Sequence, residues 1–127
     1  MTERDVVEVR VPADVVYVST LRLTAASLAA RCDLTIDEIE DLRLAVDEAC
    51  SLLLPHARDG SALDARFEVE VGRLSVEASV QTTAAAEPDR TGFAWTVLGA
   101  LASSVEVRQD ADRLVICVVK TRAAAAT

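Results

Sequence analysis

The segment 41–56, DLRLAVDEACSLLLPH, has the spacing of an amphipathic helix that carries one carboxylate, Glu48, in a position suited to chemistry. A helix carboxylate can act as a general base, and the residue four positions later lies on the same face, where it could ligate a metal ion. That residue is Leu52, whose side chain has no oxygen or nitrogen to offer a metal. The helix thus presents a candidate base without a metal ligand beside it.

The helix that holds Glu48 has a clear predicted start. Thr35 and Glu38 have the spacing of a capping box, and Leu34 and Ile39 have that of a hydrophobic staple, so we expect the helix to begin at about residue 36. Pro55 marks its end or a kink. Its apolar face is predicted to comprise Leu42, Ala45, Val46, Ala49 and Leu53.

The other elements are read from their periodicity. We expect a strand at 4–10, a helix at 11–32, a hairpin over 65–80, a third helix at 92–103, and strands near 104–109 and 113–121. Segment 82–91 is expected to be a mobile loop, and 122–127 a frayed tail of a single domain spanning 1–127. This order predicts an α+β two-layer sandwich, with a mixed, mostly antiparallel sheet and helices on one face.

The hairpin is predicted in detail. With Gly72-Arg73 as a two-residue turn, Val71 would face Leu74, Val69 would face Val76 and Phe67 would face Ala78. That face is apolar and is expected to lie under helices. The opposite face is expected to be open and acidic, with Glu68, Glu70, Ser75, Glu77 and Ser79.

Composition narrows the choice of partners. The chain has 13 Lys and Arg against 21 Asp and Glu, a net charge of -8, which would repel nucleic acid and anionic membranes. The opening MTERDVVEVR lacks a signal-peptide pattern, so we expect a cytoplasmic location. Cys32, Cys50 and Cys117 lie in apolar segments and are expected to be reduced core thiols rather than disulfides or metal ligands.

The segment DLRLAVDEACSLLLPH resembles the N-box helix of the bacterial anti-sigma serine kinases, switch proteins that hold stress and sporulation sigma factors. The resemblance extends over nearly the whole chain, including the passage TGFAWTVLGALASSVEV and the final strand. It implies the Bergerat-type fold of the histidine-kinase/Hsp90-like ATPases. In that family a Glu is the general base, an Asn four residues later holds magnesium, and glycine-rich segments contact adenine and phosphates. The base position matches Glu48 and the Asn position is Leu52.

Three further nucleotide motifs of that family are altered here. The segment QTTAAAEPDR, where an Asp-x-Gly-x-Gly loop would read adenine, has no glycine and only Asp89. The phosphate segment reads Gly92-Phe93-Ala94-Trp95, so Gly92 is retained as a vestigial cofactor-binding candidate and the second glycine is Ala94. A Gly-Thr pair before the last strand is replaced by Asp112-Arg113. We therefore interpret the nucleotide site as degenerate, with Glu48 as a vestigial catalytic candidate.

Several residues have both an ordinary and a functional interpretation. Arg22 stands on the first helix where the family carries an Arg that touches the sigma factor and its antagonist, but it could be only a solvated surface residue. His56 is expected to do no more than favour the helix dipole. Phe93 and Trp95 are expected in the core, filling space that a nucleotide would use.

The resemblance implies an anti-sigma factor that sequesters an alternative sigma factor and is released by an anti-anti-sigma antagonist protein. The family and the open sheet together predict a homodimer. Because the nucleotide motifs are altered, we expect no cofactor and no metal. The first alternative is an active serine-protein kinase that phosphorylates its antagonist with Mg-ATP and uses Glu48 as the base. A second alternative is an adaptor or sensor domain with an unrelated ligand in the old pocket. The sequence does not identify the sigma factor, the antagonist or the upstream signal.

Overall fold

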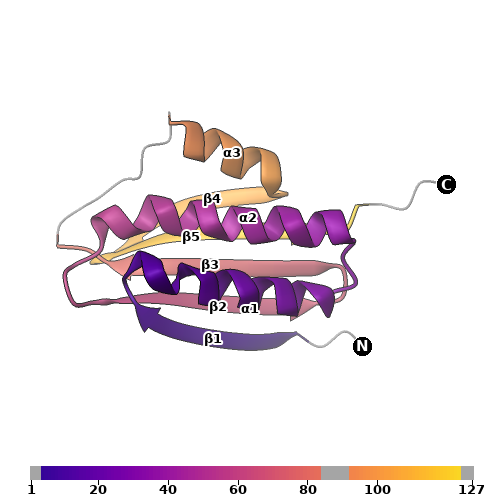
Figure 1. The fold of residues 1–127 in the computed structure, drawn as a ribbon, viewed down its shortest axis with the longest axis horizontal. Coiled ribbons are helices and arrows are strands. Elements are labelled where there is room, and N and C mark those ends of the chain that lie inside the picture. Colours follow the sequence, from indigo (N-terminus) through magenta and orange to yellow (C-terminus); the bar gives the residue numbers. More distant parts are fainter. Residues whose placement is uncertain (1–3, 84–91, 124–127) are drawn as a thin grey trace.

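A computed structural model describes residues 4–83 and 92–123. Within these residues five strands form one sheet and three α-helices lie on one of its faces (Figure 1). In chain order the elements are β1 (Asp5–Pro12), the 3₁₀ turn η1 (Val15–Tyr17), α1 (Val18–Ala30), α2 (Ile36–Leu53), η2 (Leu54–His56), β2 (Ala62–Glu70), β3 (Arg73–Gln81), α3 (Phe93–Leu101), β4 (Ser104–Asp110) and β5 (Arg113–Thr121). The predicted α+β two-layer sandwich is confirmed, but the sheet formed by the described strands is wholly antiparallel rather than mixed.

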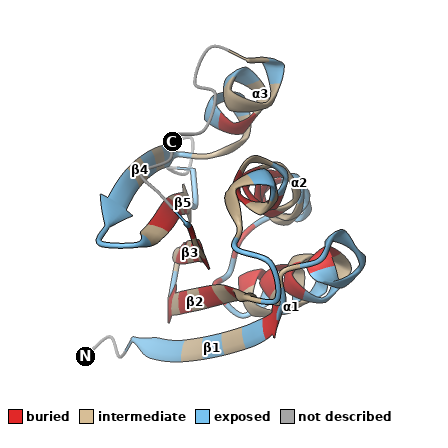
Figure 2. Cartoon of the chain, turned by 90° about the vertical axis from the view of Figure 1, so that its left-hand side faces the viewer, coloured by how far each residue is buried: buried red, intermediate tan, exposed pale blue. Residues whose placement is uncertain are grey.

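The sheet has the strand order β1-β2-β3-β5-β4, and all four of its ladders are antiparallel. Helix α1 packs over β2 and β3, α2 packs over β3 and β5, and α3 packs mainly on α2. The opposite face of the sheet carries no helix (Figure 2). The fold therefore has two very different faces, a layer of helices and an open sheet.

The core lies between the sheet and the helices. Its largest fully buried side chains include Phe67, Leu74 and Ile116 from the strands and Leu21 and Leu42 from the helices. The apolar face predicted for α2 is buried in full, because residues three and four apart share one side of a helix. Full burial of a Leu, Ile or Phe side chain contributes about 1.5 to 3 kcal/mol to the free energy of unfolding.

Helix α2 begins as predicted. The Thr35 hydroxyl accepts a hydrogen bond from the Glu38 amide at 3.1 Å, and the Glu38 carboxylate accepts one from the Thr35 amide at 2.8 Å. This capping box satisfies two amides at the helix start that have no partner within the helix. The first helix is shorter than predicted, since β1 extends to Pro12 and α1 begins only at Val18.

The predicted register of the β2–β3 hairpin is wrong by two residues. The turn is Val71-Gly72, so Val69 pairs with Leu74 and Phe67 pairs with Val76. Gly72 has φ +79°, a conformation that glycine adopts without strain, and its carbonyl accepts a hydrogen bond from Arg122 at 2.8 Å. A shift of two residues keeps each side chain on its face, so the apolar face was still identified correctly. Val71 itself lies in the turn and is 74% exposed.

The chain beyond β5 is held by contacts with the start of α2. Arg122 forms an ion pair with Asp33 at 2.6 Å, and the Ala123 amide donates to Glu38 at 2.7 Å. These two residues, placed by sequence in a frayed tail, are thus bonded, while 124–127 lie outside the described residues. No helix in the described part is long and apolar enough to cross a membrane.

The three cysteines are free thiols. Cys32 and Cys50 are fully buried in the core, as predicted, and burial raises the pKa of Cys50 to about 12. Cys117 differs from the prediction, because it is half-buried and points to the open face of the sheet beside Ser75. Burial also raises its pKa.

Candidate functional site

Glu48 and Leu52 lie one turn apart on α2, on the side of that helix that faces α3. Glu48 is half-buried and has no hydrogen bond or ion pair to any described residue. Leu52 is half-buried and packs against the hydrophobic core. Glu48 is therefore a carboxylate without a partner among the described residues, and it lies next to a leucine that packs on the core.

Gly92 is the N-cap residue of α3, and as a glycine it has no side chain that could cap the helix. Ala94 and Trp95 follow in the first turn, and both are half-buried. Trp95 packs against the core, as predicted. The same prediction was wrong for Phe93, which is 83% exposed, because it lies on the side of α3 away from Leu98, the buried residue of the helix.

Asp112, at the position of the altered Gly-Thr pair, forms hydrogen bonds that stabilise the start of the segment that precedes α3. The Asp112 carbonyl accepts hydrogen bonds from the amide and the hydroxyl of Thr82, at 2.6 and 3.0 Å. The Asp112 carboxylate accepts one from Gln81 at 2.8 Å, which lowers its pKa. Asp89 and the rest of the expected adenine loop at 84–91 lie outside the described residues. Asp112 thus bonds to Gln81 and Thr82, at the end of β3.

Arg22 lies on α1, and its guanidinium forms an ion pair with Asp47 of α2 at 2.9 Å. The two side chains are 31% and 37% exposed, so the pair is accessible from solvent. Sequence reasoning identified Arg22 as a candidate but missed its partner, because the register between two helices is not visible in their separate periodicities. An accessible guanidinium on the outer side of the helix layer is suited to contact a partner protein.

Lys120 was missed by sequence reasoning. From the helix-covered face of β5 its ammonium donates to the carbonyl of Leu101, at the end of α3, at 2.7 Å and to the Asp41 carboxylate of α2 at 3.2 Å. A cation at a helix C-terminus interacts favourably with the helix dipole. This contact holds α3 against α2. His56 ends the short turn η2 after α2, where it is half-buried.

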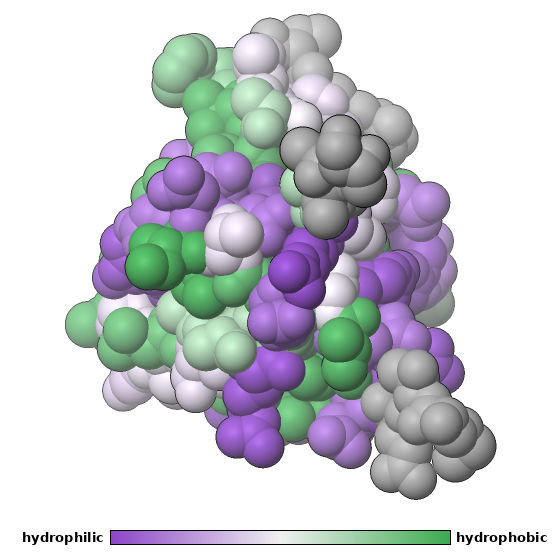
Figure 3. Space-filling view, turned by 90° about the vertical axis from the view of Figure 1, so that its right-hand side faces the viewer, coloured by the Kyte–Doolittle hydropathy of each residue, from purple (hydrophilic) through white to green (hydrophobic). Residues whose placement is uncertain are grey.

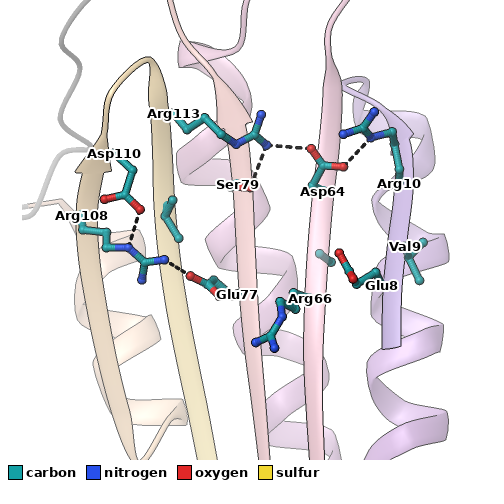
Figure 4. Close-up of a pocket in the computed structure, with 12 residues that line it drawn as sticks. Glu8, Val9, Arg10, Asp64, Arg66, Glu77, Ser79, Arg108, Asp110 and Arg113 are labelled. Carbon is teal, nitrogen blue, oxygen red and sulfur yellow. Dashed lines mark hydrogen bonds and ion pairs between the residues drawn. The ribbon is translucent and has the colours of Figure 1, made fainter. Parts of the chain in front are cut away.

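The open face of the sheet contains a hollow of about 610 Å³ (Figure 4). Asp64 in β2 accepts from Arg10 of β1 and from Arg113 of β5, both at 2.7 Å, and Arg108 of β4 bonds to Glu77 and Asp110. The prediction of an acidic face was therefore wrong, because arginines from all five strands alternate with the carboxylates. None of Glu48, Leu52 or Gly92 lines this hollow.

Comparison with known proteins identifies the family. A family model described as a histidine kinase-like ATPase domain matches residues 11–120. The chain belongs to the histidine kinase-like ATPase domain family. The match covers every described element of the sheet and helix layers apart from most of β1, which begins at Asp5, and the last residue of β5.

Among its relatives are serine-protein kinases named RsbW. The protein from Bacillus velezensis is 40% identical over 78 residues, which cover 59% of this chain and 49% of that protein. The Bacillus subtilis protein is 43% identical over 76 residues, 57% of this chain and 47% of that protein. The matched part of this ATPase-family chain thus spans about half the length of these relatives.

A solved structure also shares the fold. The crystal structure of the RsbU and RsbW domains of a Mycobacterium tuberculosis protein superposes with a TM-score of 0.71 and 14% sequence identity, over 92% of this chain and 32% of that chain. The low identity limits this comparison to the fold.

Proposed function

We propose that this chain is an anti-sigma factor that sequesters an alternative sigma factor by direct binding and releases it when an antagonist protein competes. The proposal is supported by similarity to the RsbW proteins and by the family resemblance of the α2 segment. The observation that carries it is Leu52, an apolar side chain packed on the core where an active member of the family needs a magnesium ligand. The chain would then act by binding alone.

The residues around Glu48 do not fit Mg-ATP. Leu52 can ligate nothing, and Asp41, two turns before Glu48, is already engaged by Lys120. At the start of α3 Gly92 is retained, but Ala94 carries a methyl group where the family has a second glycine. Phosphates placed here would lose water without gaining a metal ion or a glycine loop in return. We derive no catalytic step from this site.

The second candidate is an active serine-protein kinase, in keeping with the names of the relatives. Its structural support is Glu48, a half-buried carboxylate with no partner in the described chain, as a general base would need before its substrate binds. We further propose one cytoplasmic domain that forms a homodimer, with a sigma factor and an antagonist as partners rather than nucleic acid or a membrane. The net charge of -8 favours a basic protein partner.

Two substitutions separate the candidates. Tagged protein carrying Arg22→Glu or Glu48→Gln is tested for capture of the host's sigma factors without added nucleotide. We expect Arg22→Glu to weaken capture at least about tenfold, or roughly 1.4 kcal/mol, and Glu48→Gln to leave it nearly unchanged. The matched control is Asp47→Asn, which frees Arg22 from its ion pair and should preserve capture.

Loss of the Arg22–Asp47 pair alone is too small to explain a failure of folding, since exposed ion pairs contribute about 0.2 to 1 kcal/mol. If capture requires ATP, or if Glu48→Gln abolishes it while Arg22→Glu is harmless, the kinase replaces the anti-sigma factor as the better explanation.

A further inference from the structure

The outward side of helix α3 carries a single hydroxyl residue, Thr96, and no charged one. No charged residue occurs between Gly92 and Ser104, although a surface helix normally turns charged residues to solvent. Of its nine residues only Leu98 is fully buried. In Figure 3 apolar surface lies at the top, over α3, with hydrophilic surface beneath it and further apolar patches lower down. The helix is thus far more apolar than its burial requires.

Three apolar residues of α3, of which one is exposed, form a stripe. Phe93, Val97 and Leu101 are spaced by four and therefore lie along one side of α3. Val97 and Leu101 are half-buried, and Phe93 at the N-terminal end is 83% exposed. From the neighbouring helix α2, Leu44 adds an apolar side chain that is 42% exposed.

Carboxylates of α2 border this stripe. The two helices run in opposite directions (Figure 1), and Lys120 joins Asp41 of α2 to the last residue of α3. Glu48 follows Asp41 by seven residues, or about 10 Å of helix, which places it beside the N-terminal part of α3. Neither Glu48 nor Asp37 has an ion-pair partner in the described chain. We call Phe93, Val97, Leu101, Leu44, Asp37, Asp41 and Glu48 together the α2–α3 surface.

We propose that the α2–α3 surface is a docking site for a basic amphipathic helix of a partner protein. The apolar side of such a helix would cover the stripe, with Phe93 as the main anchor, and its Lys and Arg side chains would meet the unpaired carboxylates of α2. An acidic helix is disfavoured by those carboxylates and by the net charge of -8. The nine residues of α3 extend about 13 Å, enough for two turns of contact.

This inference rests on the proposed function only for the identity of the partner, which would be the sigma factor. Arg22 of α1 is paired with Asp47 of α2. Helix α1 lies on the other side of α2 from α3, in the same layer of helices (Figure 2). One partner can therefore reach both places. Affinity at a protein interface comes mostly from a few buried anchors. A single neutralised carboxylate such as Glu48→Gln should consequently change binding little, whereas loss of Phe93 should change it strongly.

The test uses model peptides rather than a sigma factor. A fluorescent peptide of about 20 Leu and Lys residues, with Leu at helical spacing, is titrated with the protein and followed by anisotropy at physiological salt, where charges are screened beyond about 8 Å. One control peptide has the same composition in scrambled order, and another has Glu in place of Lys. The variants are Phe93→Asp and, as a match in exposure and charge change, Val71→Asp in the β2–β3 turn.

We expect the Leu-Lys peptide to bind, the two control peptides to bind at least about tenfold more weakly, and Phe93→Asp but not Val71→Asp to weaken binding at least about tenfold. If net charge alone attracted the peptide, both variants would bind it more tightly than the wild type, because each adds a negative charge. Equal binding of the scrambled peptide, or equal binding by both variants, overturns the proposal.

The proposal is also overturned if wild type self-associates through this surface, so that Phe93→Asp is monomeric and the peptide does not bind. Because the probe contains no sigma factor, failure of sigma capture leaves this result intact. Failure of the peptide to bind equally leaves the sigma capture assay intact. The two proposals can therefore fail separately.

Discussion

Replacing Leu52 by Asn tests the nucleotide site most directly, because it restores the side chain that the family uses to hold magnesium. Leu52 is half-buried against the core, so losing its packing should cost about 1 kcal/mol, half the value for a fully buried Leu. The lower helix propensity of Asn adds about 0.5 kcal/mol. We expect a free energy of unfolding lower by about 1.5 kcal/mol in total, which shifts the urea midpoint by on the order of 1 M.

Mg-ATP binding is then measured by calorimetric titration of the wild type and of Leu52→Asn. We expect no saturable heat for either protein up to about millimolar nucleotide, because the glycine segments that would approach adenine and phosphates are still missing. The control is Leu44→Asn on the same helix, where 42% exposure predicts a smaller loss of stability than at Leu52.

Two results would refute this reasoning. Wild-type binding with a dissociation constant of about 10 μM or tighter, near -7 kcal/mol, would show that the pocket is functional despite Leu52. Tight binding by Leu52→Asn alone would show that the remaining site is intact and that only the metal ligand has been lost.

Further predictions concern assembly, stability and thiol chemistry. We expect a homodimer by light scattering at micromolar concentration, formed through the β1 edge or the open sheet face, and a monomeric mass at every concentration would contradict it. Thr35→Ala should lower the free energy of unfolding by about 1 kcal/mol through loss of the capping box, measured by urea denaturation, and an unchanged midpoint would argue against the cap. In native protein a thiol reagent should modify Cys117 before Cys50, whose burial raises its pKa to about 12, whereas in denaturant all thiols should react at one rate. Hydrogen bonds from the Thr35 and Ala123 amides lower the pKa of Glu38 below its ordinary 4.5. The contribution of Glu38 to the free energy of unfolding is therefore complete above pH 4.5 and is lost as the pH falls through the lowered pKa. A fluorescence melt that is unchanged on acidification from neutral pH to below pH 4.5 would contradict this.

The fold was largely predictable because its signals are local. The start of α2 follows from Thr35 and Glu38, and the side of β2 that meets the core follows from strict alternation. The turn of the hairpin was misplaced because Gly72 can occupy either central position of a two-residue turn. In the observed turn, Gly72 forms backbone hydrogen bonds with Cys32 and Arg122, which are distant in sequence.

The candidate site was only partly predictable for a related reason. The positions of Glu48 and Leu52 on one side of α2 follow from helical spacing alone. The ion pair of Arg22 with Asp47 and the contact of Lys120 with α3 depend on how elements pack, which no single segment encodes. Phe93 was assigned to the core on its residue type, but hydrophobic residues are not always inside, and its place on α3 leaves it exposed.

The contact of Lys120 also determines how α3 can respond to a bound partner. The C-terminal end of the helix is anchored, since the Leu101 carbonyl is bonded to a side chain that is itself bonded to α2. The N-terminal end has no side-chain cap at Gly92. A rotation of α3 would therefore pivot near Leu101 and displace Phe93 most. The residue proposed as the main anchor thus lies at the end of the helix that can move furthest. Spin labels at positions 93 and 101 would measure this difference directly, with the larger change in distance to the sheet expected at 93.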